Sequence, residues 1–102
     1  MRILPEPVSF QWDEGNIDKN FNKHGVTDKE TEEVFNNEPK FIFGDPKHSQ
    51  KEERFGLFGY TNLGRKLSIS FTVRGDKIRI ITARDMSKKE RRVYEQQIKN
   101  YA

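Results

Sequence analysis

The stretch LSISFTVRGDKIRIITA, residues 67–83, decides the fold, because it is the clearest hairpin pattern in this 102-residue chain. Apolar and small polar residues alternate along 67–73, as they do in a strand with one buried face. Gly75 and Asp76 then supply a two-residue turn, and a second apolar run follows over 78–83. The pattern predicts an antiparallel hairpin at the centre of a sheet.

The turn also sets the register of this hairpin. If Arg74 pairs with Lys77, then Thr72 faces Arg79 across the two strands. The isoleucines at 78 and 80 then point to the core, and Arg79 projects from the opposite face. Simple alternation places Arg84 where the strand turns inward at the end of the sheet.

The flanking sequence predicts further strands and three helices. Thr27 to Glu30 and Ser87 to Glu90 both have the spacing of a helix capping box. The full expected order is β-α-α-β-β-β-β-α: a strand at 8–12, a helix from about Asp13 to His24, a helix from Thr27 to near Asn37, strands at 41–43, 54–60, 67–73 and 78–83, and a helix from Ser87 to about Tyr101. This order indicates an α+β domain over residues 8–102, with helices on an antiparallel sheet, after a flexible lead-in at residues 1–7.

Two of these helices have a predicted inner stripe. In the first helix, Ile17, Phe21 and His24 lie on one side, and Gly25 suits the residue that ends the helix. The inner stripe of the last helix is expected to consist of Val93, Tyr94, Gln97, Ile98 and Tyr101.

The composition is that of a small domain with a thin core. Hydrophobic residues make up 32% and charged residues 34%, but twelve aromatic side chains can still bury a large apolar area. The absence of cysteine excludes disulfides and thiolate metal sites. No apolar run is long enough for a signal peptide or a membrane span, so we expect a soluble, cytoplasmic protein without membrane contact.

The charge is divided unevenly along the chain. Residues 1–64 hold eight Lys and Arg against twelve Asp and Glu, a net charge of −4, whereas residues 65–102 hold eleven against four, a net charge of +7. The last third is therefore expected to form a basic surface that attracts nucleic acid or an acidic protein, and charge alone does not choose between them.

Several short motifs occur in a consistent order and spacing over about residues 9–98. They are FQWDE (10–14), N-x-x-K-H-G-V (20–26), GD followed by E-x-R (44–54), FTVRGDKIRIITAR (71–84) and ERRVY (90–94). Together they resemble the BrnT family, the ribonuclease half of a bacterial type II toxin–antitoxin pair. Thr82 stands where the family usually has Ser, which preserves a hydroxyl.

The resemblance implies a RelE-like fold and RNA cleavage on a basic concave sheet face flanked by helices. It also implies an antitoxin partner that resembles BrnA and carries a ribbon-helix-helix DNA-binding domain, so that operator DNA is reached only indirectly, through the antitoxin. The other partner is the RNA substrate.

Metal-free RNA cleavage needs a group that takes the 2′-hydroxyl proton, a group that stabilises the phosphorane charge, and a group that protonates the leaving oxygen. Arginine suits the second role because its planar fork binds two phosphate oxygens and keeps its charge. The candidate catalytic residues are His24, Arg79, Arg84, Arg91 and Tyr94. The candidate RNA-binding residues are Lys23, Arg54, Lys88, Lys89 and Arg92. We expect the three arginines at 79, 84 and 91 to meet in one pocket.

Structural roles compete with these functional ones. His24 also fits a packed residue at a helix C-terminus, and Tyr94 also fits the core stripe. The competing partners for the arginines are a carboxylate for Arg79, Asp85 or Glu90 for Arg84, Glu95 for Arg91 and a surface ion pair for Arg54. Lys23 could touch phosphate or be solvated, and His48, in a polar loop, is expected to be solvated.

No metal or other cofactor is predicted. The acidic pairs at 13–14, 32–33 and 52–53 are adjacent in the sequence, and adjacent side chains do not converge on one face. The alternative to an endoribonuclease toxin is a non-catalytic RelE-like module that binds an antitoxin and assists promoter repression.

Overall fold

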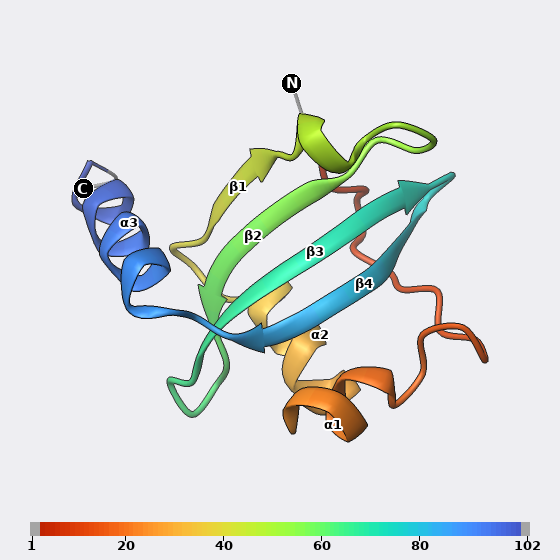
Figure 1. Ribbon diagram of the computed structural model, residues 1–102, viewed down its shortest axis with the longest axis horizontal. Coiled ribbons are helices and arrows are strands. Elements are labelled where there is room, and N and C mark those ends of the chain that lie inside the picture. The colour runs from red at the N-terminus through yellow and green to blue at the C-terminus, as the bar shows by residue number, and fades with distance from the viewer. Residues whose placement is uncertain (1–2, 101–102) are drawn as a thin grey trace.

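Four strands form one antiparallel sheet in the order β1-β2-β3-β4, which is also their order along the chain (Figure 1). The computed structural model describes residues 3–100. The strands are β1 (Phe41–Gly44), β2 (Phe55–Tyr60), β3 (Lys66–Arg74) and β4 (Lys77–Asp85). Each strand pairs with the next one in the sequence, so the sheet needs only hairpin connections.

The predicted register of the β3–β4 hairpin is confirmed. Arg74 pairs with Lys77 and Thr72 with Arg79, and the turn glycine has a φ of 62°. Further along, Ser70 pairs with Thr82 while the next residue of β3 pairs with Ile80. Ile81 is therefore an extra residue on β4, a β-bulge that the sequence pattern did not reveal.

Within residues 3–100, three α-helices and one short 3₁₀-helix accompany the sheet. They are α1 (Lys19–His24), α2 (Asp28–Asn36), α3 (Lys88–Lys99) and η1 (Pro46–His48). Both predicted capping boxes are present: the side chains of Thr27 and Ser87 accept from the backbone N–H groups of Glu30 and Glu90, and both glutamates reach back to the cap.

The predicted first strand at residues 8–12 is wrong, so the order is α-α-β-β-β-β-α. This segment meets the sheet only at one parallel bridge, where Gln11 N–H donates to the Ile78 carbonyl and Ile78 N–H to the Ser9 carbonyl, both at 2.8 Å. The alternating apolar residues nevertheless pack inward, since Phe10 and Trp12 contact the core. The chain turns away at residue 13 before a second pair of bonds can form.

The predicted helix from Asp13 to His24 is wrong in its first half. Residues 14–18 form turns, and Asp18 has a left-handed φ of 55°, which starts the helix only at Lys19. Its predicted apolar stripe is also wrong, since Ile17 is 49% and Phe21 is 53% exposed. The buried side chains on this segment are instead Asn16 and Asn20, and the amide of Asn16 donates to the Ile80 carbonyl of β4.

Opposite faces of the sheet carry two separate cores. α2 packs behind β2 and β3 in Figure 1, over a cluster that includes Phe35, Leu57, Ile69, Phe71 and Ile80, and Ile3 and Leu4 pack against the same cluster. α3 packs against β1 and β2 on the other face through Tyr94 and Ile98.

The inner stripe of α3 is narrower than predicted. Val93 is 39% exposed and Gln97 is exposed, so two of the expected residues do not pack inward. Tyr101 lies outside the described residues. Among residues 3–100, every helix is too short or too polar to cross a membrane.

Candidate RNA-binding face

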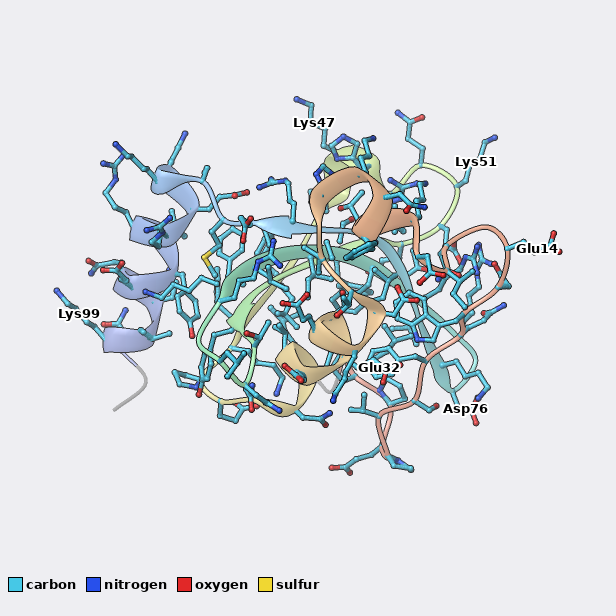
Figure 2. All side chains as sticks on the ribbon, turned by 90° about the horizontal axis from the view of Figure 1, so that it is seen from below. Glu14, Glu32, Lys47, Lys51, Asp76 and Lys99 are labelled. Atoms are coloured by element: carbon cyan, nitrogen blue, oxygen red, sulfur yellow. The ribbon has the colours of Figure 1, made fainter. Side chains whose placement is uncertain are left out.

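The face of the sheet opposite α2 is divided into an aromatic half and a polar half. Phe41, Phe43 and Phe58 line the aromatic half, beneath α3. The polar half consists of three cross-strand pairs, Ser68–Arg84, Ser70–Thr82 and Thr72–Arg79. Figure 2 shows Lys47 and Lys51 on one side of the molecule and Glu32 of α2 on the other. We call the open half the polar face.

The β-bulge at Ile81 places Arg84 on the polar face together with Arg79. An odd spacing of five residues puts two side chains on opposite faces of a regular strand. The extra residue reverses the alternation, so that Ala83 is buried and Arg84 points outward. The predicted inward orientation of Arg84 is therefore wrong.

The three arginines expected in one pocket are not brought together. Arg79 Nη1 lies 2.6 Å from Asp13 Oδ2, while Arg84 donates to both Glu90 oxygens at 2.7 and 2.8 Å. The two arginines stand five positions apart on β4, so their Cα atoms are separated by roughly 15 Å. Arg91 is exposed and has no ion pair within residues 3–100.

A cavity of about 180 Å³ opens beside Arg79. Four cations line it: Lys19 of α1, Arg54 before β2, Arg74 of β3 and Arg79 of β4. Thr72 also lines it; this residue is 1% exposed, and its Oγ1 has no hydrogen-bond partner in the described part of the chain. We call this cavity the Arg79 pocket. It combines converging positive charge with a buried, unused hydroxyl.

Two carboxylates partly neutralise this pocket. The hydrogen bond from Arg79 holds the pKa of Asp13 below its usual range, and the backbone N–H of Gly15 adds to the effect. The hydrogen bond from Arg74 holds the pKa of Glu52 below its usual range, and the charges of Arg54 and Arg79 contribute further. Three guanidinium groups thus act on the same small volume, where an incoming anion would meet them.

The segment that carries Asp13 packs closely against the Arg79 guanidinium. A Cβ at Gly15 would lie 2.6 Å from an Arg79 guanidinium nitrogen, so only glycine allows this approach without a shift. The ion pair leaves the Arg79 side chain 16% and the Asp13 side chain 45% exposed. Arg79 is therefore fixed in place, while its counter-ion is open to exchange with solvent.

A second, wider cleft of about 680 Å³ adjoins the Arg79 pocket, since Glu52, Arg54 and Arg74 line both. Its remaining lining comes from the loop after β1: Lys47, His48, Gln50 and Lys51. We call it the Arg54 cleft. The side chain of Arg54 has no ion pair among the described residues, whereas Arg74 binds both oxygens of Glu52 at 2.7 and 3.0 Å.

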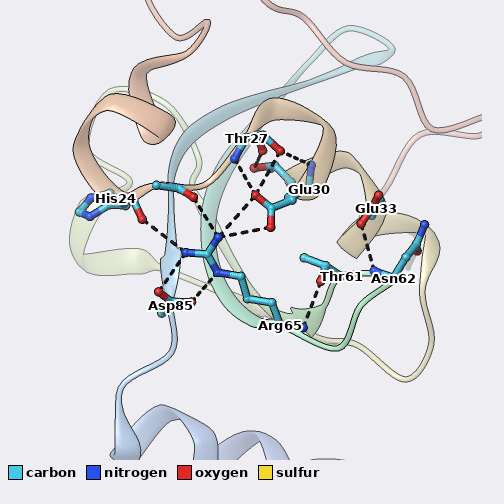
Figure 3. Close-up of polar contacts among 10 residues, drawn as sticks. His24, Thr27, Glu30, Glu33, Thr61, Asn62, Arg65 and Asp85 are labelled. Carbon is cyan, nitrogen blue, oxygen red and sulfur yellow. Dashed lines mark hydrogen bonds and ion pairs between the residues drawn. The ribbon is translucent and has the colours of Figure 1, made fainter.

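His24 lines neither of these cavities. It ends α1, where its carbonyl accepts from Arg65, and the imidazole points away from that guanidinium in Figure 3. Arg65 also bonds the Gly25 carbonyl, Glu30 of α2 and both oxygens of Asp85, so one side chain ties the α1–α2 turn to the end of β4. The hydrogen bond from Arg65 lowers the pKa of Asp85.

The remaining predicted residues lie outside the two cavities. Tyr94 is 2% exposed, its hydroxyl donates to the Pro39 carbonyl at 2.7 Å, and burial raises its pKa, which is the structural role considered for it. Lys23, Lys88, Lys89 and Arg92 are exposed and have no ion pair within residues 3–100. No group of three or more His, Asp or Glu side chains in that range is arranged to hold a metal ion.

Sequence reasoning missed Lys19, Thr72 and Arg74 as lining groups of these cavities. It also missed Asp13 as the partner of Arg79 and Arg65 as the clamp of the α1–α2 turn. Strand alternation contains a signal for Arg74, because it stands two residues from Thr72 and so shares its face. No comparable signal exists for Asp13 and Lys19. They lie at the two ends of the turn at residues 14–18, which is far from Arg79 in the sequence and close to it only in the folded protein.

A scan against protein families matches residues 12–90 to the BrnT toxin family, described as the ribonuclease toxin of a type II toxin–antitoxin system. The match spans most of the chain, from Trp12 on the core to Glu90 in the α3 cap. A search of curated proteins gives no match. The chain therefore belongs to the BrnT family of ribonuclease toxins from type II toxin–antitoxin systems.

Proposed function

We propose that this protein is an endoribonuclease toxin that binds an RNA phosphate in the Arg79 pocket and cleaves the chain without a metal ion. One observation carries the proposal: Arg54 just before β2, Arg74 of β3 and Arg79 of β4 line one cavity together with Thr72, whose buried hydroxyl has no hydrogen-bond partner among residues 3–100. Phosphate oxygens fit this set, because guanidinium groups and a hydroxyl all donate hydrogen bonds to them.

In this proposal the RNA phosphate takes the place of the pocket carboxylates. Asp13 leaves Arg79, whose guanidinium then faces the equatorial oxygens of the phosphorane. Because Arg79 is held by its surroundings at 16% exposure, little rearrangement of its side chain is needed as charge develops. The attacking oxygen is the 2′-hydroxyl of the RNA, which agrees with the RelE-like activity that the family resemblance implies.

The cations outside the pocket guide the RNA towards it. Lys88, Lys89, Arg91 and Arg92 are exposed near the end of β4, and Lys23 is exposed on α1. Long exposed cations of this kind raise the local concentration of an anionic strand without fixing its geometry. Arg84 contributes indirectly: its ion pair with Glu90 keeps α3, which carries four of these cations, in place.

The test is digestion of a defined single-stranded RNA by the purified protein in EDTA. Wild type is expected to cleave, whereas Arg79→Ala and Arg54→Ala lose about 100-fold or more in rate. Lys99→Ala, which removes an equally long cation at the far end of α3 (Figure 2), is the matched control and is expected to cleave like wild type. Intact RNA after incubation with folded wild type contradicts the proposal.

We further propose that the cognate antitoxin resembles BrnA and covers α1 and the polar face with a segment that is both acidic and apolar. The short helix α1 carries the exposed Phe21 and, on its other side, the cations Lys19 and Lys23 one turn apart, and Ile17 is exposed just before the helix. Such a segment would neutralise the toxin by occupying the charges that hold RNA. Phe21→Ser is expected to weaken the complex, and complex formation that is insensitive to salt argues against this surface.

The non-catalytic interaction module has one observation in its favour. Both Arg79 and Arg84 are engaged by internal carboxylates, Asp13 and Glu90, as in a structural role. A non-catalytic module is expected to bind the antitoxin tightly, to cleave no RNA and to cause no growth arrest on expression. The digestion assay therefore separates the two functions.

A further inference from the structure

The loop between β1 and β2 holds a histidine–carboxylate pair, His48 and Asp45, and neither residue belongs to the proposed phosphate-binding set. His48 Nδ1 lies 3.1 and 3.0 Å from the two carboxylate oxygens of Asp45. The two residues are three apart, and the single turn of η1 between them brings their side chains to the same side. The spacing D-P-K-H at 45–48 is the sequence signal for this pair.

This pair is held by backbone contacts that do not use the Asp45 side chain. The Asp45 N–H donates to the Arg54 carbonyl at 3.0 Å, and the Asp45 carbonyl accepts from Ser49 Oγ at 2.6 Å. Ser49 Oγ in turn accepts from the Arg54 N–H at 2.9 Å. The loop is thereby fixed to the start of β2, and the carboxylate is left free to orient the imidazole.

The arrangement selects one tautomer of neutral His48. A carboxylate can only accept, so Nδ1 carries the proton and Nε2 keeps its lone pair. Nε2 has no partner within residues 3–100, and the side chain is 60% exposed. This is the geometry of a histidine that is prepared to take a proton from a substrate.

His48 also lies where such a proton is expected. It lines the Arg54 cleft together with Arg54 and Arg74, and these two arginines also line the Arg79 pocket. RNA bound across the two adjoining cavities would therefore pass from the pocket arginines to the imidazole. His24, by contrast, lines neither cavity, and its ring makes no hydrogen bond to a carboxylate in the described part of the chain, although its charge acts on Asp85.

We propose that His48 is the general base of RNA cleavage, a catalytic role that rests on the proposed ribonuclease function, and that Asp45 is its positioning residue. His48 Nε2 takes the 2′-hydroxyl proton, the 2′-oxygen forms a bond to phosphorus, and the bond from phosphorus to the 5′-oxygen breaks. The leaving 5′-oxygen takes a proton from water, and His48 returns its proton to solvent. The products are a 2′,3′-cyclic phosphate and a 5′-hydroxyl, and no co-reactant is consumed.

The experiment measures single-turnover cleavage of a single-stranded RNA and binding of the same sequence made as DNA, which lacks the attacking hydroxyl. His48→Gln and His48→Ala are expected to lower the cleavage rate by about 100-fold or more while the affinity for the DNA analogue stays within about twofold. Free imidazole is expected to restore part of the rate of His48→Ala, because it can occupy the vacated space. Asp45→Asn is expected to lower kcat by about tenfold or more with KM unchanged.

Three results would overturn the inference. They are cleavage by His48→Gln within about threefold of wild type, a loss that appears in binding of the DNA analogue instead of in the rate, and a loss that falls on His24→Gln instead of on His48→Gln. Melting curves of each variant check the fold, which is expected to be unchanged because the His48 side chain is 60% exposed. If wild type does not cleave, the proposed ribonuclease function itself fails, which is a separate outcome.

Discussion

Replacing Glu90 by Gln tests how strongly the polar face is tied to α3. Glu90 binds the Arg84 guanidinium at 2.7 and 2.8 Å and accepts from the Ser87 backbone N–H at 2.9 Å, so one carboxylate serves the strand and the helix cap together. Glutamine keeps the length of the side chain and can still accept from the cap. The substitution therefore removes the charge and one of the two oxygens that accept from Arg84, so that an amide N–H₂ group faces the guanidinium.

The expected loss of stability follows from the pKa of Glu90. Arg84 is the main cause that lowers this pKa from 4.5 to about 2. A drop of that size corresponds to at most roughly 3.4 kcal/mol of folding free energy. Arg84 is 43% exposed and screened by solvent, which reduces the expected loss to about 1–2 kcal/mol for Glu90→Gln at neutral pH.

The pH dependence has a definite sign. Because the pKa of Glu90 is lower in the folded protein than in the unfolded chain, its contribution is fully present above pH 4.5 and is lost as the pH falls towards about 2. The difference between wild type and Glu90→Gln should therefore be largest at neutral pH and shrink over that window. Urea denaturation at a series of pH values measures it directly.

Glu95→Gln is the matched control, since Glu95 is an exposed residue of the same helix without an ion pair in residues 3–100. Its free energy of unfolding is expected to stay within about 0.5 kcal/mol of wild type at every pH. A gap between wild type and Glu90→Gln that stays constant from pH 7 to pH 3, or that matches the Glu95 control, would refute the reasoning.

Three further predictions concern the polar face and the sheet beneath it. Thr72→Val is expected to leave stability unchanged or raise it by up to about 1 kcal/mol, because it removes a buried unpaired hydroxyl, and to slow RNA cleavage by about tenfold; equal cleavage rates for the two proteins would contradict this role. Binding of single-stranded RNA, measured by fluorescence anisotropy, is expected to weaken with a log–log salt slope of roughly −3 if four cations neutralise phosphates, and Arg54→Ala is expected to reduce the slope by about 0.7; a slope near zero argues against the pocket. Gly56→Ala is expected to cost about 1–3 kcal/mol in urea denaturation, because its Cβ would lie 2.3 Å from the Phe43 ring, with no effect on cleavage by the folded fraction.

Local patterns predicted the elements that depend on local contacts. The β3–β4 register follows from a two-residue turn and strict alternation, and the two capping boxes follow from the spacing of Thr27 with Glu30 and of Ser87 with Glu90. In each case the partners lie within a few residues or across one tight turn. The physical cause is therefore present in the short stretch of sequence that forms the element.

The start of the chain was predicted less well, because its conformation depends on distant partners. The alternation at 8–12 is that of a strand, but the segment bonds the sheet only around Ile78. The stripe of Ile17 and Phe21 fits a buried helix face, yet the buried side chain is Asn16, whose amide bonds the Ile80 carbonyl of β4. Neither outcome can be read from a residue's own neighbours in the sequence.

The sequence by itself determined the family, the α+β class, the central hairpin and the presence of a basic last third. Only the tertiary structure decided which basic groups line one cavity. One extra residue at Ile81 turned Arg84 onto the face of Arg79, and ion pairs with Asp13 and Glu90 then held the two arginines apart. The reason is that alternation and charge count are properties of short segments, whereas a bulge and an ion pair are settled by what packs against them.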